Sequence, residues 1–379
     1  MKKALATILA LVMALSVTTM AWADDVAKID GTGYATLQEA VNAANNGQTI
    51  VLQSDVVLTA SLNVAVNKTV TLDLNSYKIT ADMNGPHMIC NAGNLTITDS
   101  SANKTGEIAK IGAETNFGYV IENHGTMTLD RCKISSTSVK SSAIENGWYT
   151  ASANTAGTSC TMTIQNAEVV SVNADGGLYT VKNDDYGVMV INGGVFTNSV
   201  AGAGAVLNWN DLTINGGTFT GASAVRTLKS GSSDFETGKS QIKNGTFNGG
   251  IDTLDGYKTG ITIAVTGGTF STDVTEYLAE GKILQKNGDT YTAVTNSGIT
   301  SGTYTSEPTV PSGYKATKND DGTWTVSKVS YYYYQPTTDT KTTDTKGSPK
   351  TFDAGIALYV GMALTSAAGV AFVGKKRED

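Results

Sequence analysis

One short segment recurs along much of the chain, and its clearest copy is Leu212–Phe219, Leu-Thr-Ile-Asn-Gly-Gly-Thr-Phe. Leu212 and Ile214 stand two residues apart and therefore point to the same face of a strand. The paired glycines permit a bend that a residue with a Cβ would resist, and Phe219 lies just beyond it, where it can return to the apolar side. The segment predicts a single β unit, repeated along the chain.

Looser copies extend from about residue 72 to residue 270. The second apolar residues of the copies are Leu74, Ile97, Leu129, Ile164, Ile191, Ile214, Ile242 and Val265, and they are separated by 23, 32, 35, 27, 23, 28 and 23 residues. A minimum spacing of 23 residues, with a variable number of extra residues, is typical of a solenoid whose coils share one cross-section and are joined by loops of different length. We therefore predict eight coils with stacked apolar side chains inside.

Both ends of the repeat region carry cap signals, since a solenoid would otherwise expose strand edges and core. Thr36 and Glu39 have capping-box spacing, so a short helix is expected at 24–66, which holds the N-terminal cap and the first strands. The coils then occupy 67–270. A short helix over Asp273–Gly281 and a hairpin about Asn287 and Gly288 form the expected C-terminal cap, 271–296, and a looser copy of this unit forms a small β module at 297–330.

Asparagine recurs just before the repeated strand. Asn91, Asn123 and Asn208 each lie six residues before the second apolar residue of their copy, and Asn183 lies two residues further off. Asparagines at one corner can stack into a hydrogen-bonded ladder along steps of about 4.8 Å. The alternative is that asparagine is simply common in turns.

Together, the strand, Gly-Gly-Thr-Phe bend and asparagine pattern over about residues 30–270 resembles the right-handed, single-stranded parallel β-helix of the pectate-lyase-like superfamily, in the form common in exported bacterial surface proteins. The resemblance implies an all-β fold. It says less about activity, although the superfamily includes polysaccharide lyases and hydrolases.

The two ends predict export and retention at the cell surface. Residues 1–23 have the basic start, apolar run and small-residue end of a signal peptide. A Thr-rich linker with a sorting motif, 331–353, precedes an apolar stretch at 354–374, long enough to cross a membrane, and a tail at 375–379 that begins with basic residues. We expect one transmembrane helix in this stretch.

Residues Ser348, Pro349, Lys350, Thr351 and Phe352 precede that stretch and, with it, resemble the sorting signal that sortases recognise in Gram-positive bacteria. Pro349 and Thr351 match the family pattern, while Ser348 replaces its Leu and Phe352 replaces its Gly. The resemblance implies sortase and peptidoglycan as partners, with Thr351 transferred to the wall. A plain membrane anchor is the alternative.

Composition narrows the function classes. The net charge is −7, and three arginines, Arg131, Arg226 and Arg377, make no basic stripe, so no nucleic-acid binding is expected. Three cysteines and two histidines give neither a disulfide framework nor a zinc pattern, and we predict no metal and no cofactor.

Catalysis would need clustered carboxylates, or a carboxylate with a basic group, on one face. Asp184 and Asp185 are the best candidates, but they are interpreted here as a solvated turn, and so is His124. Binding has better candidates in the aromatic residues of the two longest loops, Phe117, Tyr119, Trp148 and Tyr149, because aromatic rings stack on sugar faces, and Asp184 and Asp185 are included in the predicted binding set. One ring of each pair could instead turn inward.

The leading hypothesis is a non-catalytic surface protein that binds glycans, mucin or another cell surface, as adhesins do. A wall-anchored polysaccharide lyase or glycoside hydrolase is the second hypothesis, and a structural surface component is the third. Asp184 or Asp185 grouped with another acid or a base in one groove would favour the enzyme. A carboxylate-poor groove lined by Trp148 and Tyr149 would favour binding.

Overall fold

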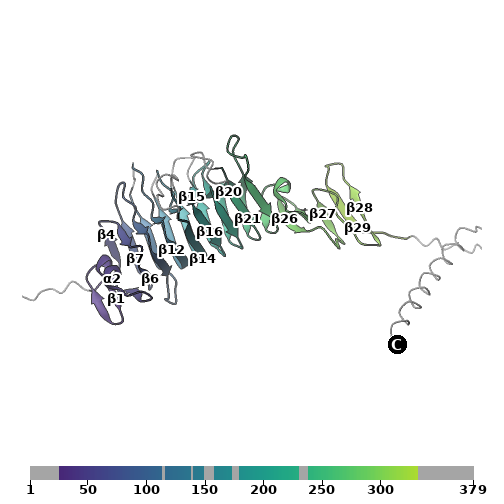
Figure 1. Cartoon of the computed structure of the whole chain (residues 1–379). Coiled ribbons are helices and arrows are strands. Elements are labelled where there is room, and N and C mark those ends of the chain that lie inside the picture. Colours follow the sequence, from purple (N-terminus) through teal and green to yellow (C-terminus); the bar gives the residue numbers. More distant parts are fainter. Residues whose placement is uncertain are drawn as a thin grey trace, which may run out of the picture. The chain divides into compact units, whose positions relative to one another are not determined.

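The computed structural model describes residues 25–112, 116–137, 140–148, 158–172, 179–229 and 238–331. In this part of the chain most residues lie in strands, and the helical elements are α2 (Leu37–Ala43) and the short 3-10 helix η2 (Thr275–Tyr277). The strands join one large, mostly parallel sheet that winds into coils (Figure 1). The predicted all-β solenoid is therefore confirmed in its class.

Each full coil contributes three short strands, and each strand pairs in parallel with its equivalents in the neighbouring coils, so the coils have three faces. Face A contains β3 (Thr49–Leu52), β6 (Thr69–Asp73), β9 (Asn94–Thr98), the first halves of β12 (Thr126–Ser136) and β14 (Cys160–Ser171), β16 (Gly187–Ile191), β19 (Asp211–Ile214), β21 (Lys239–Ile242) and β23 (Thr262–Val265). Face B contains β4 (Val56–Leu58), β7 (Lys78–Ala81), β10 (Glu107–Lys110), the second halves of β12 and β14, β17 (Gly194–Asn198), the first halves of β20 (Thr218–Thr227) and β22 (Thr246–Asp252), and β24 (Thr269–Phe270). Face C contains β5 (Leu62–Val64), β8 (Ile89–Asn91), β11 (Ile121–Asn123), β13 (Ile144–Asn146), β15 (Tyr179–Asn183), β18 (Gly204–Asn208) and the second halves of β20 and β22.

The register differs from the sequence prediction at the first coils. Leu72, and not Leu74, pairs with Ile97, so this step is 25 residues long. Leu74 is buried as well, at the bend after β6. The copy can therefore be aligned on either Leu72 or Leu74 by sequence alone. The first strands predicted within 24–66 already belong to the stack, because Ile50 of β3 pairs in parallel with Leu72.

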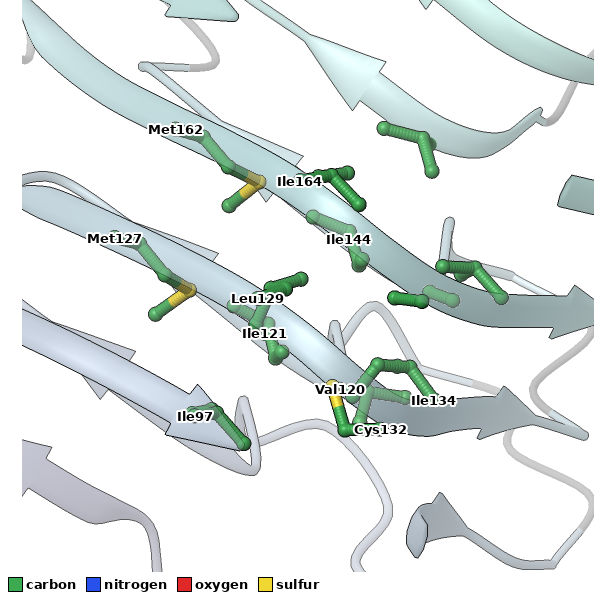
Figure 2. Packing of buried hydrophobic residues seen from close by; sticks show 14 of the residues in the cluster. Ile97, Val120, Ile121, Met127, Leu129, Cys132, Ile134, Ile144, Met162 and Ile164 are labelled. Carbon is green, nitrogen blue, oxygen red and sulfur yellow. The ribbon is translucent and has the colours of Figure 1, made fainter. Parts of the chain in front are cut away.

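The core consists of side chains repeated from coil to coil. Met127 and Leu129 lie in register with Met162 and Ile164 in the next coil, and their side chains point into the interior (Figure 2). Farther along, Phe196, Phe219, Phe247 and Phe270 form a continuous stack with ring centroids 4.9, 5.0 and 4.9 Å apart. This spacing is that of neighbouring strands, so the repeat places each ring flat on the next.

The glycine before each of these phenylalanines has a structural reason. Gly217 has φ +115°, a left-handed conformation that disfavours residues with a Cβ, and Gly245 and Gly268 repeat it at +134° and +113°. At this bend the chain passes from face A to face B. The Gly-Gly-Thr-Phe pattern therefore encodes one corner and one core position of each coil.

The N-terminal cap has the expected helix. Thr36 Oγ1 accepts from the Glu39 backbone N–H, and a Glu39 carboxylate oxygen accepts from the Thr36 N–H, which completes the capping box of α2. Leu37, Ala40 and Val41 of α2 are buried against the core. The antiparallel strands β1 (Ala27–Ile29) and β2 (Thr32–Tyr34) adjoin this helix, and β1 pairs with β3 of the first coil.

The C-terminal end departs partly from expectation. The helix predicted over Asp273–Gly281 is shorter than expected, because it is reduced to the 3-10 helix η2, with no side-chain cap. The hairpin about Asn287 and Gly288 is confirmed as β25 (Lys282–Asn287) and β26 (Thr290–Thr295), which pairs antiparallel with β24. A second unit, β27 (Gly302–Tyr304), β28 (Tyr314–Lys318) and β29 (Trp324–Lys328), repeats this arrangement and joins the first through β25 and β27.

The terminal predictions concern other parts of the chain. In the portion that the structure describes, no helix has the length and apolar character needed to cross a membrane. The predicted signal peptide at 1–23, the sorting residues Ser348–Phe352 and the apolar stretch at 354–374 lie outside the described residues.

Candidate functional site

Asparagines form a ladder at the corner where face C passes into face A. The Nδ2 atoms of Asn91, Asn123, Asn146 and Asn183 each donate to the Oδ1 of the next asparagine, at 2.7, 2.7, 2.8 and 2.8 Å, and the row ends on Asn208. Asn208 then donates to Ser240 Oγ at 3.0 Å. All five asparagine side chains are buried, so their amides hold the corner in one register through five coils.

Asn146 is a member of this row that the spacing argument missed. A long connection separates it from Ile164, so counting back from the apolar residue does not find it. A different signal does, because Ile144-Glu145-Asn146 repeats Ile121-Glu122-Asn123 and pairs with it residue for residue. The repeat also places Glu122 and Glu145 on neighbouring rungs of face C, and both point outward.

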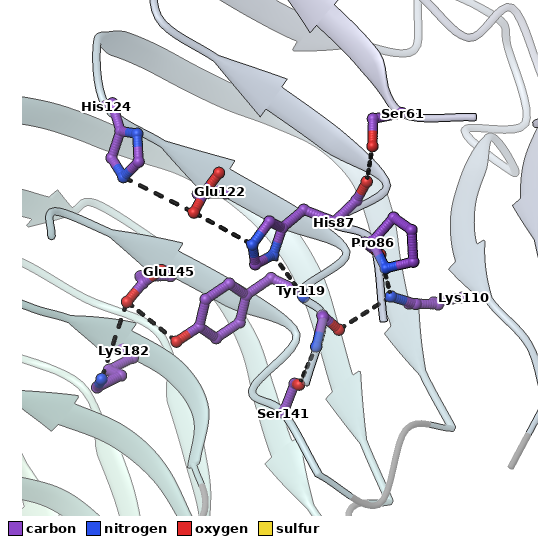
Figure 3. A network of polar contacts seen from close by, with 11 residues as sticks. Ser61, Pro86, His87, Lys110, Tyr119, Glu122, His124, Ser141, Glu145 and Lys182 are labelled. Atoms are coloured by element: carbon purple, nitrogen blue, oxygen red, sulfur yellow. Dashed lines mark hydrogen bonds and ion pairs between the residues drawn. The ribbon is translucent and has the colours of Figure 1, made fainter. Parts of the chain in front are cut away.

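Glu122 lies between two imidazoles near the surface (Figure 3). His87 Nε2 is 3.3 Å and His124 Nε2 is 3.8 Å from Glu122 Oε1, and each of the three side chains is about one-fifth to one-quarter exposed. The Tyr119 backbone N–H donates to His87 Nδ1 at 3.1 Å, so this nitrogen is an acceptor and the ring proton of His87 stands on Nε2, facing the carboxylate.

Aromatic rings border this group on both sides. The Trp148 indole stacks on His124 with ring centroids 3.7 Å apart, and the backbone N–H of Trp148 donates to the Asp185 carbonyl at 2.9 Å. On the other side His87 stacks on Tyr119 at 5.1 Å and meets Phe117 edge-on at 6.3 Å. Phe117 is 46% exposed and Trp148 is half-buried. We call Phe117, His87, Glu122, His124 and Trp148 the face C cluster.

A buried lysine positions the loops that carry one side of this cluster. Lys110 Nζ donates to the carbonyls of Pro86 and Gly118 at 2.6 and 3.0 Å, and Ser141 Oγ accepts from the Gly118 N–H at 2.6 Å. These bonds tie together the segments next to His87 and Tyr119. Because Lys110 is 1% exposed, they form in a protected environment where hydrogen bonds to a charged group are strong.

Tyr119 corrects one prediction, since it is 1% exposed and does not form part of the surface. Its hydroxyl donates to Glu145 Oε1 at 3.0 Å, and that bond draws the ring inward. Phe117 is therefore the exposed ring of its pair, as the inward alternative allowed. In the second pair Trp148 is half-buried, and Tyr149 lies outside the described residues.

Asp184 and Asp185 correct a second prediction, because they are 4% and 2% exposed and do not form a solvated turn. Asp184 pairs with Lys182, whose Nζ also lies 3.8 Å from Glu145. The acids are buried because the turn after Asn183 folds against the end of β13, where the Asp184 N–H donates to the Asn146 carbonyl at 2.8 Å.

Burial sets the protonation of these groups. It raises the pKa of Glu145 to about 9, so this carboxyl is neutral at pH 7, and it raises the pKa of Glu122 as well. It lowers the pKa of His87 to about 4 and also lowers that of His124. Burial raises the pKa of Cys90, beside Glu122 on face C, to about 11, so Cys90 remains a thiol.

Other charged candidates are engaged elsewhere. Arg226 makes a bidentate pair with Asp252, at 2.6 and 3.0 Å, farther along face C, and Arg131 pairs with its neighbour Asp130 at 2.7 Å. Neither arginine contacts the face C cluster. Among the described ranges no group of three or more His, Cys, Asp or Glu side chains has the arrangement that holds a metal ion.

The cluster thus offers one carboxylate and two imidazole N–H or N groups between aromatic rings, on a rigid sheet. It can exchange hydrogen bonds with hydroxyl groups while the rings contact C–H surfaces. In the comparison with known proteins, no family model, curated protein or solved structure matches this chain.

Proposed function

We propose that this protein is a non-catalytic, surface-displayed β-solenoid that binds glycans through the face C cluster. The carrying observation is the partly exposed Glu122 carboxylate, held between His87 and His124, with Trp148 and Phe117 at its borders. A carboxylate and imidazoles bond sugar hydroxyls, and exposed ring surfaces contact the apolar face of a pyranose. Adhesion to a glycan-coated surface is the role that such a site would serve.

A lyase or hydrolase is the second candidate, and two observations favour it. Asp184 pairs with Lys182, which also lies 3.8 Å from Glu145, although these groups are buried. Glu122 and Glu145 occupy neighbouring rungs of one face, and both have raised pKa values, as general acids do. Glu145, however, is 1% exposed and already accepts the Tyr119 hydroxyl. A mechanism with two carboxylates needs both of them to reach the substrate, so binding is the better-supported function.

A glycan array probed with the protein, with product analysis of every glycan that binds, tests this function. We expect binding to a limited set of glycans and no shortened or unsaturated products. Products would establish the enzyme. If no glycan on the array binds and no product forms, glycan binding is rejected and the structural role remains.

The finer fold and the location are further proposals. Right-handed coiling of the pectate-lyase-like kind is supported by the parallel pairing of successive coils, since crossovers between parallel strands are right-handed in nearly all cases. Export by residues 1–23 and sortase attachment to peptidoglycan through Ser348–Phe352 rest on the sequence patterns.

Fractionation tests the attachment. If Thr351 is joined to the wall, a wall-digesting enzyme should release the protein, and detergent alone should not. Release by detergent alone would show instead that residues 354–374 act as a plain membrane anchor. Thr351→Ala should convert the first pattern into the second, whereas Thr343→Ala, in the linker, should leave it unchanged.

A further inference from the structure

A groove of about 390 Å³ adjoins the face C cluster on the side of the N-terminal cap. It is lined by Gln38 and Asn42 of α2, by residues of the first coils and by His124. His124 is shared, because its ring also stacks on Trp148 and faces Glu122. A ligand held at the cluster could therefore continue past His124 into this groove.

The groove is polar without being charged. Among the described residues that line the groove, His124 is the one imidazole, and none is Asp, Glu, Lys or Arg. The pKa of His124 is lowered from its ordinary value because its ring is partly buried, so the imidazole is neutral at pH 7. Val64, Ala65 and Ala92 supply small apolar walls. A neutral ligand that combines hydrogen-bonding groups with a methyl-sized apolar group fits such a lining.

The hydrogen bonds at the groove fix the orientation of its amides. Gln38 Nε2 donates to the Asn63 carbonyl at 3.0 Å, and Gln38 Oε1 accepts from the Asn63 N–H at 2.8 Å, so Gln38 has one possible orientation. Gln38 Nε2 also donates to Asn42 at 2.9 Å, which requires the oxygen of Asn42 there and leaves Asn42 Nδ2 as a donor for a ligand. Asn63 Nδ2 donates to the Ser61 carbonyl at 2.9 Å and leaves Asn63 Oδ1 as an acceptor.

We propose that this groove binds the acetamido group of an N-acetylhexosamine residue in the glycan held at the face C cluster. The acetamido carbonyl accepts from Asn42 Nδ2, its N–H donates to Asn63 Oδ1, and its methyl group packs on the small apolar walls. This inference rests on the proposed function, since the cluster holds the rest of the chain. It adds a preference that the cluster alone would not have.

Two neutral tetrasaccharides with the same β-1,4 linkage test the inference, one of N-acetylglucosamine and one of glucose. Calorimetric titration of the protein should show at least tenfold tighter binding of the acetylated tetrasaccharide. Asn42→Ala/Asn63→Ala should remove this preference and leave binding of the glucose tetrasaccharide unchanged. Asn45→Ala, an exposed asparagine of the same cap outside the groove, should keep the preference.

The outcomes separate the two proposals. Equal binding of both sugars by the unaltered protein, or a preference that survives in the double variant, overturns the acetamido site and leaves the cluster as a glycan site. If the double variant binds neither tetrasaccharide, Asn42 and Asn63 are needed for folding of the cap, and the acetamido site is overturned. Equal unfolding temperatures of the unaltered protein, the double variant and Asn45→Ala would contradict that role in folding. If neither tetrasaccharide binds the unaltered protein, the acetamido site is overturned, and the glycan array alone then tests the proposed function.

Discussion

Between pH 7 and pH 8.5 the free energy of unfolding should fall by on the order of 1 to 2 kcal/mol through Glu145, which interacts electrostatically with its neighbours Asp184 and Lys182, because each pKa unit of differential protonation is worth about 1.4 kcal/mol. The pKa of Glu145 is about 9 in the folded protein, against an ordinary 4.5. The folded state therefore keeps a proton that the unfolded state has released. This contribution to stability is complete below pH 4.5 and is lost as the pH rises to about 9.

The pH window is chosen so that other groups contribute little. His87, whose folded pKa is lowered from 6.5 to about 4, acts in the opposite direction but only below about pH 6.5. The buried Cys132 thiol, whose pKa is raised from 9 to about 12, destabilises the folded state mainly above the window. Urea unfolding at pH 7 and pH 8.5 measures the change.

Glu145→Gln should remove most of this pH dependence, because a glutamine keeps the acceptor for the Tyr119 hydroxyl and cannot ionise. The variant should be the more stable protein at pH 8.5. Glu280→Gln, at an exposed position of the C-terminal unit, is the matched control and should retain the slope. If Glu145→Gln also retains the slope, Glu145 is not the buried neutral acid described above.

Asn146→Ala should lower the free energy of unfolding by about 2 kcal/mol, since it leaves the buried Asn183 Oδ1 without its donor and breaks the ladder at this rung. Asn183 Oδ1 loses its donor, whereas Asn123 Nδ2 loses one acceptor and keeps the carbonyls of Gly125 and Thr161. Water does not reach this corner to replace them, because both neighbours are fully buried.

Asn94→Ala is the matched control for the ladder. Asn94 begins β9 on the outside of the sheet, and the substitution should change stability by no more than about 0.5 kcal/mol. Chemical denaturation of both variants at pH 7 gives the comparison. Equal stabilities of the two variants would mean that the ladder follows from the fold without contributing to its stability.

The class of fold was predictable because the repeat specifies it locally. Leu212, Ile214, Gly217 and Phe219 each have one role in the coil, and those roles recur in sequence. The predicted register between the first two copies was wrong, because Leu74 follows Leu72 at the same two-residue spacing and both are buried. Periodicity cannot decide between two apolar residues that both face the core.

The candidate site was less predictable, because its contacts join residues that are distant in sequence. The position of Tyr119 in a long loop predicts a surface ring. The sequence contains no sign that its hydroxyl donates a hydrogen bond to Glu145, 26 residues further along the chain. Asp184 and Asp185 were interpreted as a solvated turn because Asn-Asp-Asp is typical of turns, yet the stacking of the coils buries them. Trp148 was identified, but His87 and Glu122 were not, since neither belongs to a recognisable motif.

The most direct test of the central claim is to titrate the strongest ligand from the array into the protein and into Trp148→Ala. We expect the dissociation constant of Trp148→Ala to be at least tenfold higher than that of the unaltered protein, because the ring that borders Glu122 and stacks on His124 is lost. Trp209→Ala removes the half-buried tryptophan that follows Asn208 at the same corner, away from the cluster, and should leave the dissociation constant unchanged. Equal affinities of Trp148→Ala and the unaltered protein would contradict glycan binding at face C.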